Sequence, residues 1–180
     1  MSLRKGKKEK NISNNFRNVS EENILQIKTE FGKEIYKNPI EQYNCGGFAL
    51  GKTIWFELFN WENSLLLLDE LEFFNKESYE KALKEKIEKI AKKCVEEILH
   101  IHGIRLINSI EELKNNEYAF IFRNAADDFH FMRRLQNGKW CHKQGELPIE
   151  EIEESEIFNK EWKHRDTPYC SQIYMFAKRI

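Results

Sequence analysis

The hydrophobic period of this chain changes once, near residue 103, and that change limits the fold more than any other feature. From residue 77 to residue 100, apolar side chains recur at helical spacing with Lys and Glu between them, as in an amphipathic helix. Beyond residue 103, short apolar runs are separated by polar turns. Helices first and strands later predict an α+β fold with an antiparallel sheet.

The last third of the chain supplies the strands of this sheet. We predict strands at residues 104–107, 118–122, 129–136, 139–143 and 173–177. Asn137-Gly138 is a strong hairpin signal, so the third and fourth strands should pair. Within the acidic stretch 146–156, residues 150–154 are expected to be a solvated helix face, with binding of a basic partner as the alternative.

Length and composition indicate one domain behind a disordered tail. The chain has 180 residues, of which 41% are hydrophobic and 13% aromatic, which is enough for a core. Residues 1–20 are basic and rich in Asn and Ser, so we expect a disordered tail, a single domain over 21–180 and a helical insertion at about 60–103. Another helix should begin at Ser20, with acids in its first turn.

Charge and hydropathy narrow the function classes. A net charge of −1 argues against a dedicated nucleic-acid binder. No apolar run reaches the roughly 18 residues of a membrane span, and no apolar segment typical of a signal peptide follows the N-terminus. We therefore expect a cytoplasmic protein whose four cysteines are free thiols.

Cys45 is the strongest candidate for a reactive group. Phe48, Trp55 and Phe59 recur at helical spacing, which predicts a buried helix that begins at or just before Cys45. A thiol at a helix N-terminus is favoured as thiolate, the nucleophilic form. Gly46 and Gly47 lower helix propensity, and they would let a substrate carbonyl approach the backbone.

His130 is the matching base, and His142 the group that would orient it. A two-residue hairpin turn puts the two imidazoles on opposite faces of the sheet, because side chains alternate along a strand. A three-residue loop with Gly138 in the left-handed conformation instead pairs His142 with Met132, on the face of His130. Both loops are common, so the sequence leaves this choice open. The structural alternative is a buried Cys45 and a His130 bonded to Asp127 or Asp128.

Three segments carry a resemblance to a known family. These are Tyr43-Asn44-Cys45-Gly46-Gly47-Phe48-Ala49-Leu50, Asp128-Phe129-His130-Phe131-Met132-Arg133 and Gly138-Lys139-Trp140-Cys141-His142-Lys143. They resemble papain-like cysteine hydrolases of the NlpC/P60 superfamily. The resemblance implies a nucleophile helix packed on a small antiparallel sheet and cleavage of an amide or peptide bond without a cofactor or metal.

Carried onto this chain, the family pattern makes Cys45 the nucleophile, His130 the base and His142 the orienting group, with Asp128 in reserve. The backbone N–H groups of Cys45 and Gly46, with Gln42 or Tyr43, are expected to hold the oxyanion or the substrate. The chain departs from the pattern in its helical insertion and in lacking the signal peptide or wall-binding repeats of cell-wall members.

Two other classes compete with the hydrolase. The same fold could serve as a non-catalytic module that binds a peptide or protein. Gly46-Gly47-Phe48-Ala49-Leu50-Gly51-Lys52-Thr53 also matches the P-loop pattern, which requires a preceding strand and a helix that begins at Lys52-Thr53. His100 and His102 do not share a helix face, so we expect no metal site with Cys94.

Overall fold

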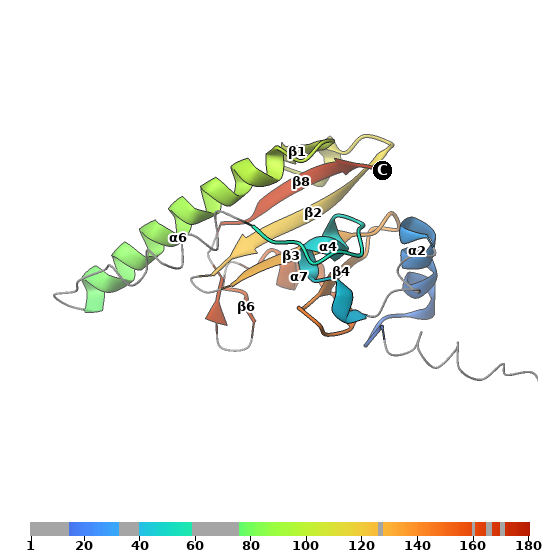
Figure 1. Ribbon diagram of the computed structural model, residues 1–180, viewed down its shortest axis with the longest axis horizontal. Coiled ribbons are helices and arrows are strands. Elements are labelled where there is room, and N and C mark those ends of the chain that lie inside the picture. Colours follow the sequence, from blue (N-terminus) through green and yellow to red (C-terminus); the bar gives the residue numbers. More distant parts are fainter. Residues whose placement is uncertain are drawn as a thin grey trace, which may run out of the picture. The chain divides into compact units, whose positions relative to one another are not determined.

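The described part of the chain divides into two compact units, each built from two stretches of sequence. One unit comprises residues 1–56 and 131–154, and the other comprises residues 57–130 and 155–180. The computed structural model describes residues 15–32, 40–58, 76–125, 128–159, 161–164, 167–169 and 172–180. Both units combine helices with antiparallel strands (Figure 1), so the predicted α+β class is confirmed.

The first unit contains a ladder in the order β3-β4-β5. Its strands are β3 (Phe129–Arg134), β4 (Trp140–Lys143) and β5 (Ile149–Ile152). The first two residues of β3 belong to the second unit and the other four to the first. Met132 pairs with His142, and Leu135 N–H donates to the Lys139 carbonyl at 2.7 Å. The hairpin therefore has the three-residue loop, with Gly138 at a φ of 92°.

Residues 149–152 of the acidic stretch form a strand, which corrects the predicted solvated helix face at these positions. β5 pairs with β4 along its whole length. Its carboxylates have partners within the unit: Glu150 accepts from Arg17, and Glu151 accepts from Ser20 N–H at 2.6 Å and from Asn23 Nδ2 at 2.8 Å. Ile149 and Ile152 flank them and are buried. The order Ile-Glu-Glu-Ile has no alternation of apolar and polar residues, so the sequence carried no strand period here.

Residues 15–20, which fall within the predicted tail, are attached to β5. Arg17 N–H donates to the Ile149 carbonyl and Ile149 N–H donates to the Asn15 carbonyl, both at 2.9 Å. α2 (Glu21–Phe31) then begins at Ser20 as predicted, because the Ser20 hydroxyl accepts a hydrogen bond from Asn23 N–H. Residues 1–14, the rest of the predicted tail, lie outside the described residues.

A buried ion pair joins α2 to the hairpin. Glu30 accepts from the Arg133 guanidinium at 2.9 Å, and the two side chains are only 2% and 4% exposed. The same carboxylate accepts from Gln136 N–H at 2.6 Å, at the start of the hairpin loop. Arg133 also lies 4.1 Å above the Phe31 ring. Charge-assisted hydrogen bonds of this kind hold a loop in one conformation.

The remaining elements of the first unit are the single turn η1 (Ile40–Gln42) and the short helix α4 (Cys45–Ala49). Side chains from α2, α4 and the strands meet in one core cluster. Its buried members are Ile27, Tyr43, Phe48, Leu135, Cys141 and Ile149.

The second unit contains an antiparallel ladder in the order β1-β8-β2. β1 is Ile104–Ile107, β2 is Glu117–Asn124 and β8 is Tyr174–Arg179. All three were predicted, and the C-terminal strand lies between the other two. Phe120 and Phe176 are direct partners in this register, and their rings stack at 5.0 Å.

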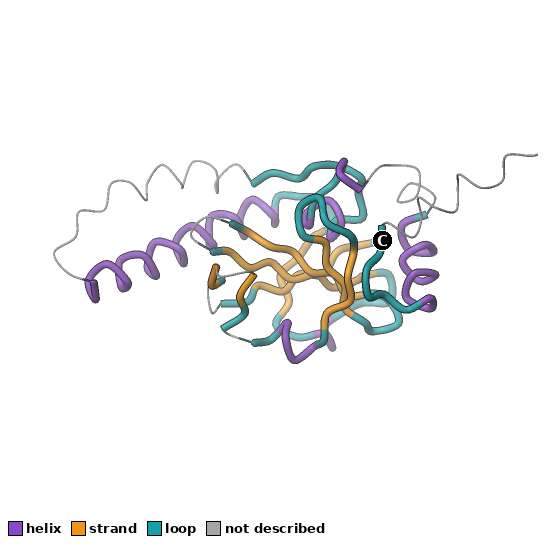
Figure 2. Tube along the Cα trace, turned by 90° about the horizontal axis from the view of Figure 1, so that it is seen from below, coloured by secondary structure: helices purple, strands orange, loops and turns teal. Residues whose placement is uncertain are grey.

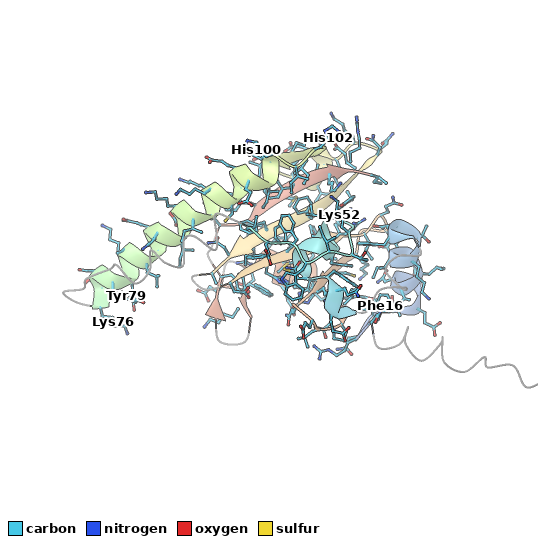
Figure 3. The ribbon with its side chains drawn as sticks, viewed as in Figure 1. Phe16, Lys52, Lys76, Tyr79, His100 and His102 are labelled. Atoms are coloured by element: carbon cyan, nitrogen blue, oxygen red, sulfur yellow. The ribbon has the colours of Figure 1, made fainter. Side chains whose placement is uncertain are left out.

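The long helix α6 (Lys76–Leu99) matches the predicted helix over 77–100. Its C-terminal half packs on β1 and β2 through Ile90, Cys94 and Ile98, all buried. Asn124 Nδ2 donates to the Ile87 carbonyl at 3.1 Å. The N-terminal half extends past these strands in both views (Figures 1 and 2). Tyr79, on the predicted apolar stripe, is accordingly 38% exposed (Figure 3).

Short elements complete this unit. They are η2 (Ile110–Glu112), α7 (Glu154–Ile157) and the strand pair β6 (Lys163–His164) and β7 (Thr167–Pro168). Residues 59–75 of the predicted helical insertion lie outside the described residues. Across the described ranges, none of the helices combines the length and apolarity needed to cross a bilayer.

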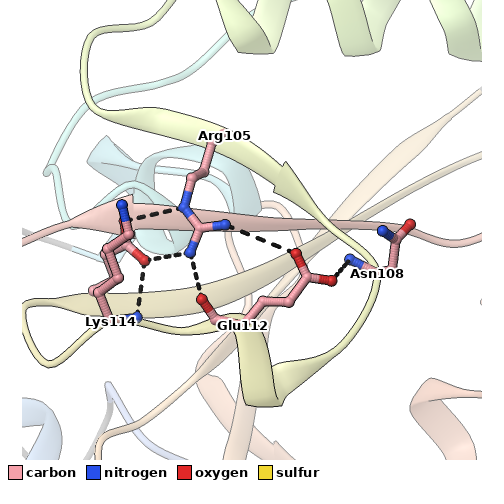
Figure 4. Close-up of polar contacts among 5 residues, drawn as sticks. Arg105, Asn108, Glu112 and Lys114 are labelled. Carbon is pink, nitrogen blue, oxygen red and sulfur yellow. Dashed lines mark hydrogen bonds and ion pairs between the residues drawn. The ribbon is translucent and has the colours of Figure 1, made fainter.

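A polar network fixes the turn between β1 and β2 (Figure 4). Arg105 donates to Glu117 at 2.7 and 3.2 Å and to the Glu112 carbonyl at 2.5 Å. Lys114 N–H donates to the same Glu117 carboxylate at 3.0 Å. The hydrogen bonds from Arg105, reinforced by that from Lys114, lower the pKa of Glu117 to about 2.

This network predicts an acid-dependent contribution to stability. Because the folded-state pKa of Glu117 lies below its unfolded value, the stabilisation is present above about pH 4.5 and is lost as the pH falls towards 2. We expect Arg105→Gln to be less stable than wild type near pH 7 and the difference to shrink below about pH 4. Urea unfolding at several pH values measures it.

Lys76→Gln is the control, since Lys76 and Glu80 form an exposed pair, 88% and 63% accessible. Exposed pairs of this kind contribute little to stability. A stability deficit of Arg105→Gln that stays constant down to about pH 2 would contradict the proposed role of the Glu117 carboxylate.

Candidate active site

Asn44 determines where α4 begins. Its backbone is extended, and its Oδ1 accepts from Gly47 N–H at 3.1 Å as the N-cap of the helix. The same oxygen accepts from Phe56 N–H at 3.1 Å, and Nδ2 donates to the Phe56 carbonyl at 2.6 Å. One side chain therefore caps the helix and anchors the segment that returns to it. Cys45 is the first helical residue, as predicted.

The predicted extension of this helix towards Phe59 is wrong, because α4 ends at Ala49. Gly51 has a φ of 70°, the left-handed conformation that commonly follows a helix C-terminus. The chain then turns back towards Asn44, and Ile54 and Trp55 are 46% and 48% exposed. The helical spacing of Phe48 and Trp55 was coincidental. Phe59 itself lies outside the described residues.

The returning segment explains the two glycines after Cys45. A Cβ at position 47 would lie 2.0 Å from the Ile54 carbonyl oxygen, and one at position 46 would lie 2.5 Å from Cδ1 of Phe56. Because Gly46 and Gly47 have no Cβ, the Ile54 carbonyl and the Phe56 ring can pack against them. This space was predicted to admit a substrate carbonyl.

The register of the β3–β4 pairing determines which side chains of β4 face α4. α4 packs on β4, and Phe48 belongs to the core cluster that contains Cys141. Lys143 lies on the same side of β4 as Cys141, because side chains alternate. His142 lies on the other side, opposite Met132, and not on the side of Cys141.

Lys143, which was not predicted as a site residue, belongs to the strand on which α4 packs. Its side chain is fully buried. Its Nζ donates to the Gly145 carbonyl and lies 4.7 Å from the centre of the Tyr43 ring. Burial lowers the pKa of Lys143 to about 8, while negative charge at Cys45, Glu41 and Glu146 opposes this change. A lysine within an otherwise buried strand was the available sequence signal.

Tyr43 is buried beneath this ammonium. It is fully inaccessible, and among the described residues its hydroxyl has no hydrogen-bond partner. Burial raises the pKa of Tyr43 above its usual range, with Glu41 adding to the effect, so the phenol stays protonated. The residues predicted to hold the oxyanion or the substrate therefore differ in burial, since Gln42 is exposed whereas Tyr43 and Gly46 are buried.

His130 lies in an aromatic cluster of the second unit and is 2% exposed. Its ring stacks on Trp162 at 5.3 Å and meets the edge of Tyr169 at 6.3 Å. The Tyr169 hydroxyl donates to Asp128, whose other oxygen accepts from Phe129 N–H at 2.8 Å. Asp128, the reserve orienting group, is therefore held by Tyr169. Nothing in the local sequence around His130 pointed to either aromatic residue.

The structure also bears on the predictions about a metal site and a P-loop. His100 and His102 follow the C-terminal end of α6 (Figure 3). Across the described ranges, no three His, Cys, Asp or Glu side chains are grouped as metal ligands would be. The P-loop arrangement is not formed, because η1 rather than a strand precedes Gly46 and the helix comes before Lys52 instead of after it.

Comparisons with protein-family models, with curated proteins and with solved structures each give no match to this chain. The NlpC/P60 resemblance therefore stays a prediction from the motifs at residues 43–50 and 128–143.

The contact at Gly47 gives a test of how α4 is held. We expect Gly47→Ala to lower the free energy of unfolding by about 1–3 kcal/mol, because a Cβ there meets backbone that cannot move without breaking the Asn44 hydrogen bonds. Gly46→Ala should cost less, because it meets a phenyl ring that can rotate. Urea unfolding of both variants measures the difference. A Gly47→Ala protein as stable as wild type would contradict this account.

Proposed function

We propose that this chain is a cysteine hydrolase that cleaves an amide or peptide bond through a thioester on Cys45. The observation that carries the proposal is the setting of this thiol. Cys45 is 5% exposed and is the first residue of a helix capped by Asn44, and this helix packs on β4, which carries the buried Lys143. Electropositive surroundings of this kind favour the thiolate, which is the nucleophile.

The other cysteines of the described ranges have different surroundings. Burial raises the pKa of Cys94 to about 12, and burial also raises the pKa of Cys141. Both thiols therefore stay protonated near neutral pH and are poor nucleophiles. Of these three thiols, Cys45 alone is the first residue of a helix, and it is therefore our candidate for covalent chemistry.

In the proposed reaction, His130 takes the proton of the Cys45 thiol, the sulfur attacks the carbonyl carbon of the substrate, and His130 gives that proton to the leaving amine. Water then attacks the thioester, His130 takes a proton from it, and the thiolate leaves. His142 would orient His130, and the Cys45 N–H would contribute to the oxyanion site. The link from Cys45 to His130 rests on the motifs alone, and it is the part that mutagenesis must decide.

Cysteine-resolved alkylation by iodoacetamide tests the proposal. We expect Cys45 to react faster than Cys94 and Cys141 near pH 7, and His130→Ala to slow its reaction about tenfold or more, because the imidazole assists loss of the thiol proton. Mass spectrometry of each cysteine peptide gives the rates. The control is His102→Ala, which changes an exposed histidine that follows α6.

If Cys45 reacts no faster than the buried thiols and His130→Ala has no effect, the hydrolase proposal fails. The binding module on the same fold then takes its place. One observation favours that second candidate: Ile54 and Trp55 expose large apolar side chains on the segment that returns to Asn44. Loss of peptide binding in Trp55→Ser, with the thermal midpoint unchanged, would support it.

A further inference from the structure

A contact between two side-chain amides attaches the loop of the β3–β4 hairpin to α2. Asn137 Nδ2 donates to Asn23 Oδ1 at 2.6 Å, and Asn137 Oδ1 accepts from Lys139 N–H at 3.2 Å. Asn23 is 4% exposed, and its own Nδ2 donates to the Glu151 carboxylate at 2.8 Å. Because an ionised carboxylate only accepts and a backbone N–H only donates, these outer partners fix the orientation of both amides.

The same helix also holds the residue before Asn137. Glu30 accepts from Gln136 N–H at 2.6 Å and from the Arg133 guanidinium at 2.9 Å. Asn23 and Glu30 lie about two turns apart on one face of α2, since a turn takes about 3.6 residues. α2 therefore fixes two consecutive residues of the hairpin loop.

Asn137-Gly138 is the only Asn-Gly pair in the sequence, and this pair has a reaction of its own. The Gly138 nitrogen can attack Cγ of Asn137, because glycine has no Cβ to hinder the approach. The nitrogen loses its proton to water, ammonia leaves from Cγ, and a succinimide ring closes. Water then opens the ring. Cleavage of the bond from nitrogen to Cγ gives aspartate, and cleavage of the bond from nitrogen to the main-chain carbonyl carbon gives isoaspartate.

The observed contacts oppose this ring closure. Gly138 N–H donates to the Leu135 carbonyl at 2.9 Å, and the Asn137 amide is bonded through both its oxygen and its nitrogen. Attack requires Cγ to turn towards the Gly138 nitrogen, so these hydrogen bonds must break first. Asn137 is exposed, so burial does not protect it. Two of the three bonds are local to the loop, whereas the bond to Asn23 depends on the docking of α2.

We propose that Asn137 is a deamidation site controlled by α2. Asn23 protects the amide while α2 is docked, and the amide is converted to aspartate or isoaspartate when α2 separates from the hairpin. Conversion then hinders the return of α2, because the new carboxylate has no donor to offer Asn23 Oδ1. It also adds negative charge to a loop that already binds Glu30. Isoaspartate further lengthens the main chain of the loop. The inference is independent of the proposed function.

The experiment follows deamidation of the full chain during incubation at mildly alkaline pH. Trypsin cleaves after Arg134 and Lys139, so mass spectrometry of peptide 135–139 reports Asn137 alone. We expect conversion in the folded protein to be about tenfold slower or more than in urea-unfolded protein, because ring closure waits for local opening. Asn23→Ala should raise the rate in the folded protein about fivefold, the effect of losing one hydrogen bond.

Thr29→Ala is the matched control. Thr29 is an exposed residue of α2, and its hydroxyl donates to the Leu25 carbonyl of the same helix at 2.9 Å. This variant should leave the rate unchanged. Thermal unfolding verifies that each variant is folded, and Asn23→Ser, whose side chain is too short for the contact, replaces Asn23→Ala if that protein does not fold.

The outcomes that overturn the inference are distinct. Equal rates in folded and urea-unfolded wild type would show that the fold gives Asn137 no protection. An unchanged rate in the folded Asn23 variant would show that the loop alone protects the amide, without α2.

The effect of conversion on α2 is tested with Asn137→Asp, which carries the aspartate product. We expect it to unfold at lower urea than wild type, and this deficit should shrink when Asn23→Ala removes the opposing oxygen. An Asn137→Asp protein as stable as wild type would overturn the claim that conversion hinders the return of α2.

Discussion

The candidate site depends on the side-chain amide of Asn44. Its oxygen accepts two backbone N–H groups and its nitrogen donates to one carbonyl, all within 3.1 Å. α4 has only five residues, too few to be stable alone. It persists because Asn44 joins its first turn to Phe56, and because Gly47 leaves room for the Ile54 carbonyl. The position of Cys45 thus follows from local hydrogen bonding more than from helix propensity.

Three buried cationic side chains of the described residues differ in the partners that compensate their charge. Arg133 forms an ion pair with Glu30, and Arg123 donates to the carbonyls of Ile157 and Asn159 at 3.3 and 2.8 Å. Arg133 thus has a carboxylate partner and Arg123 has two carbonyl acceptors, which suit a guanidinium. Within the described residues, Lys143 is a compact ammonium with one carbonyl acceptor and an aromatic ring beside it. Lys143 therefore has less compensation for its lost hydration than either arginine.

Sequence patterns located most of the fold and about half of the candidate site. Period and turn signals predicted α2, α6 and the strands β1, β2 and β8, because these elements bury one regular face. The short strands β6 and β7 were not predicted. β5 was missed because its half-buried positions are glutamates whose partners, Arg17 and Asn23, lie far away in the sequence. Cys45 was found through its capped helix start. Lys143, Trp162 and Tyr169 were not, since only tertiary packing brings each of them to Cys45 or His130.

His142 and Lys143 are adjacent basic residues on opposite sides of one strand, so the register of the hairpin decides which of them faces α4. A shift by one residue would exchange the two sides. Two features hold the observed register: Gly138 adopts a φ of 92° that favours glycine, and Glu30 receives Gln136 N–H beside its ion pair with Arg133. Because the hairpin loop has three residues, Lys143 and not His142 lies on the side of β4 that packs against α4.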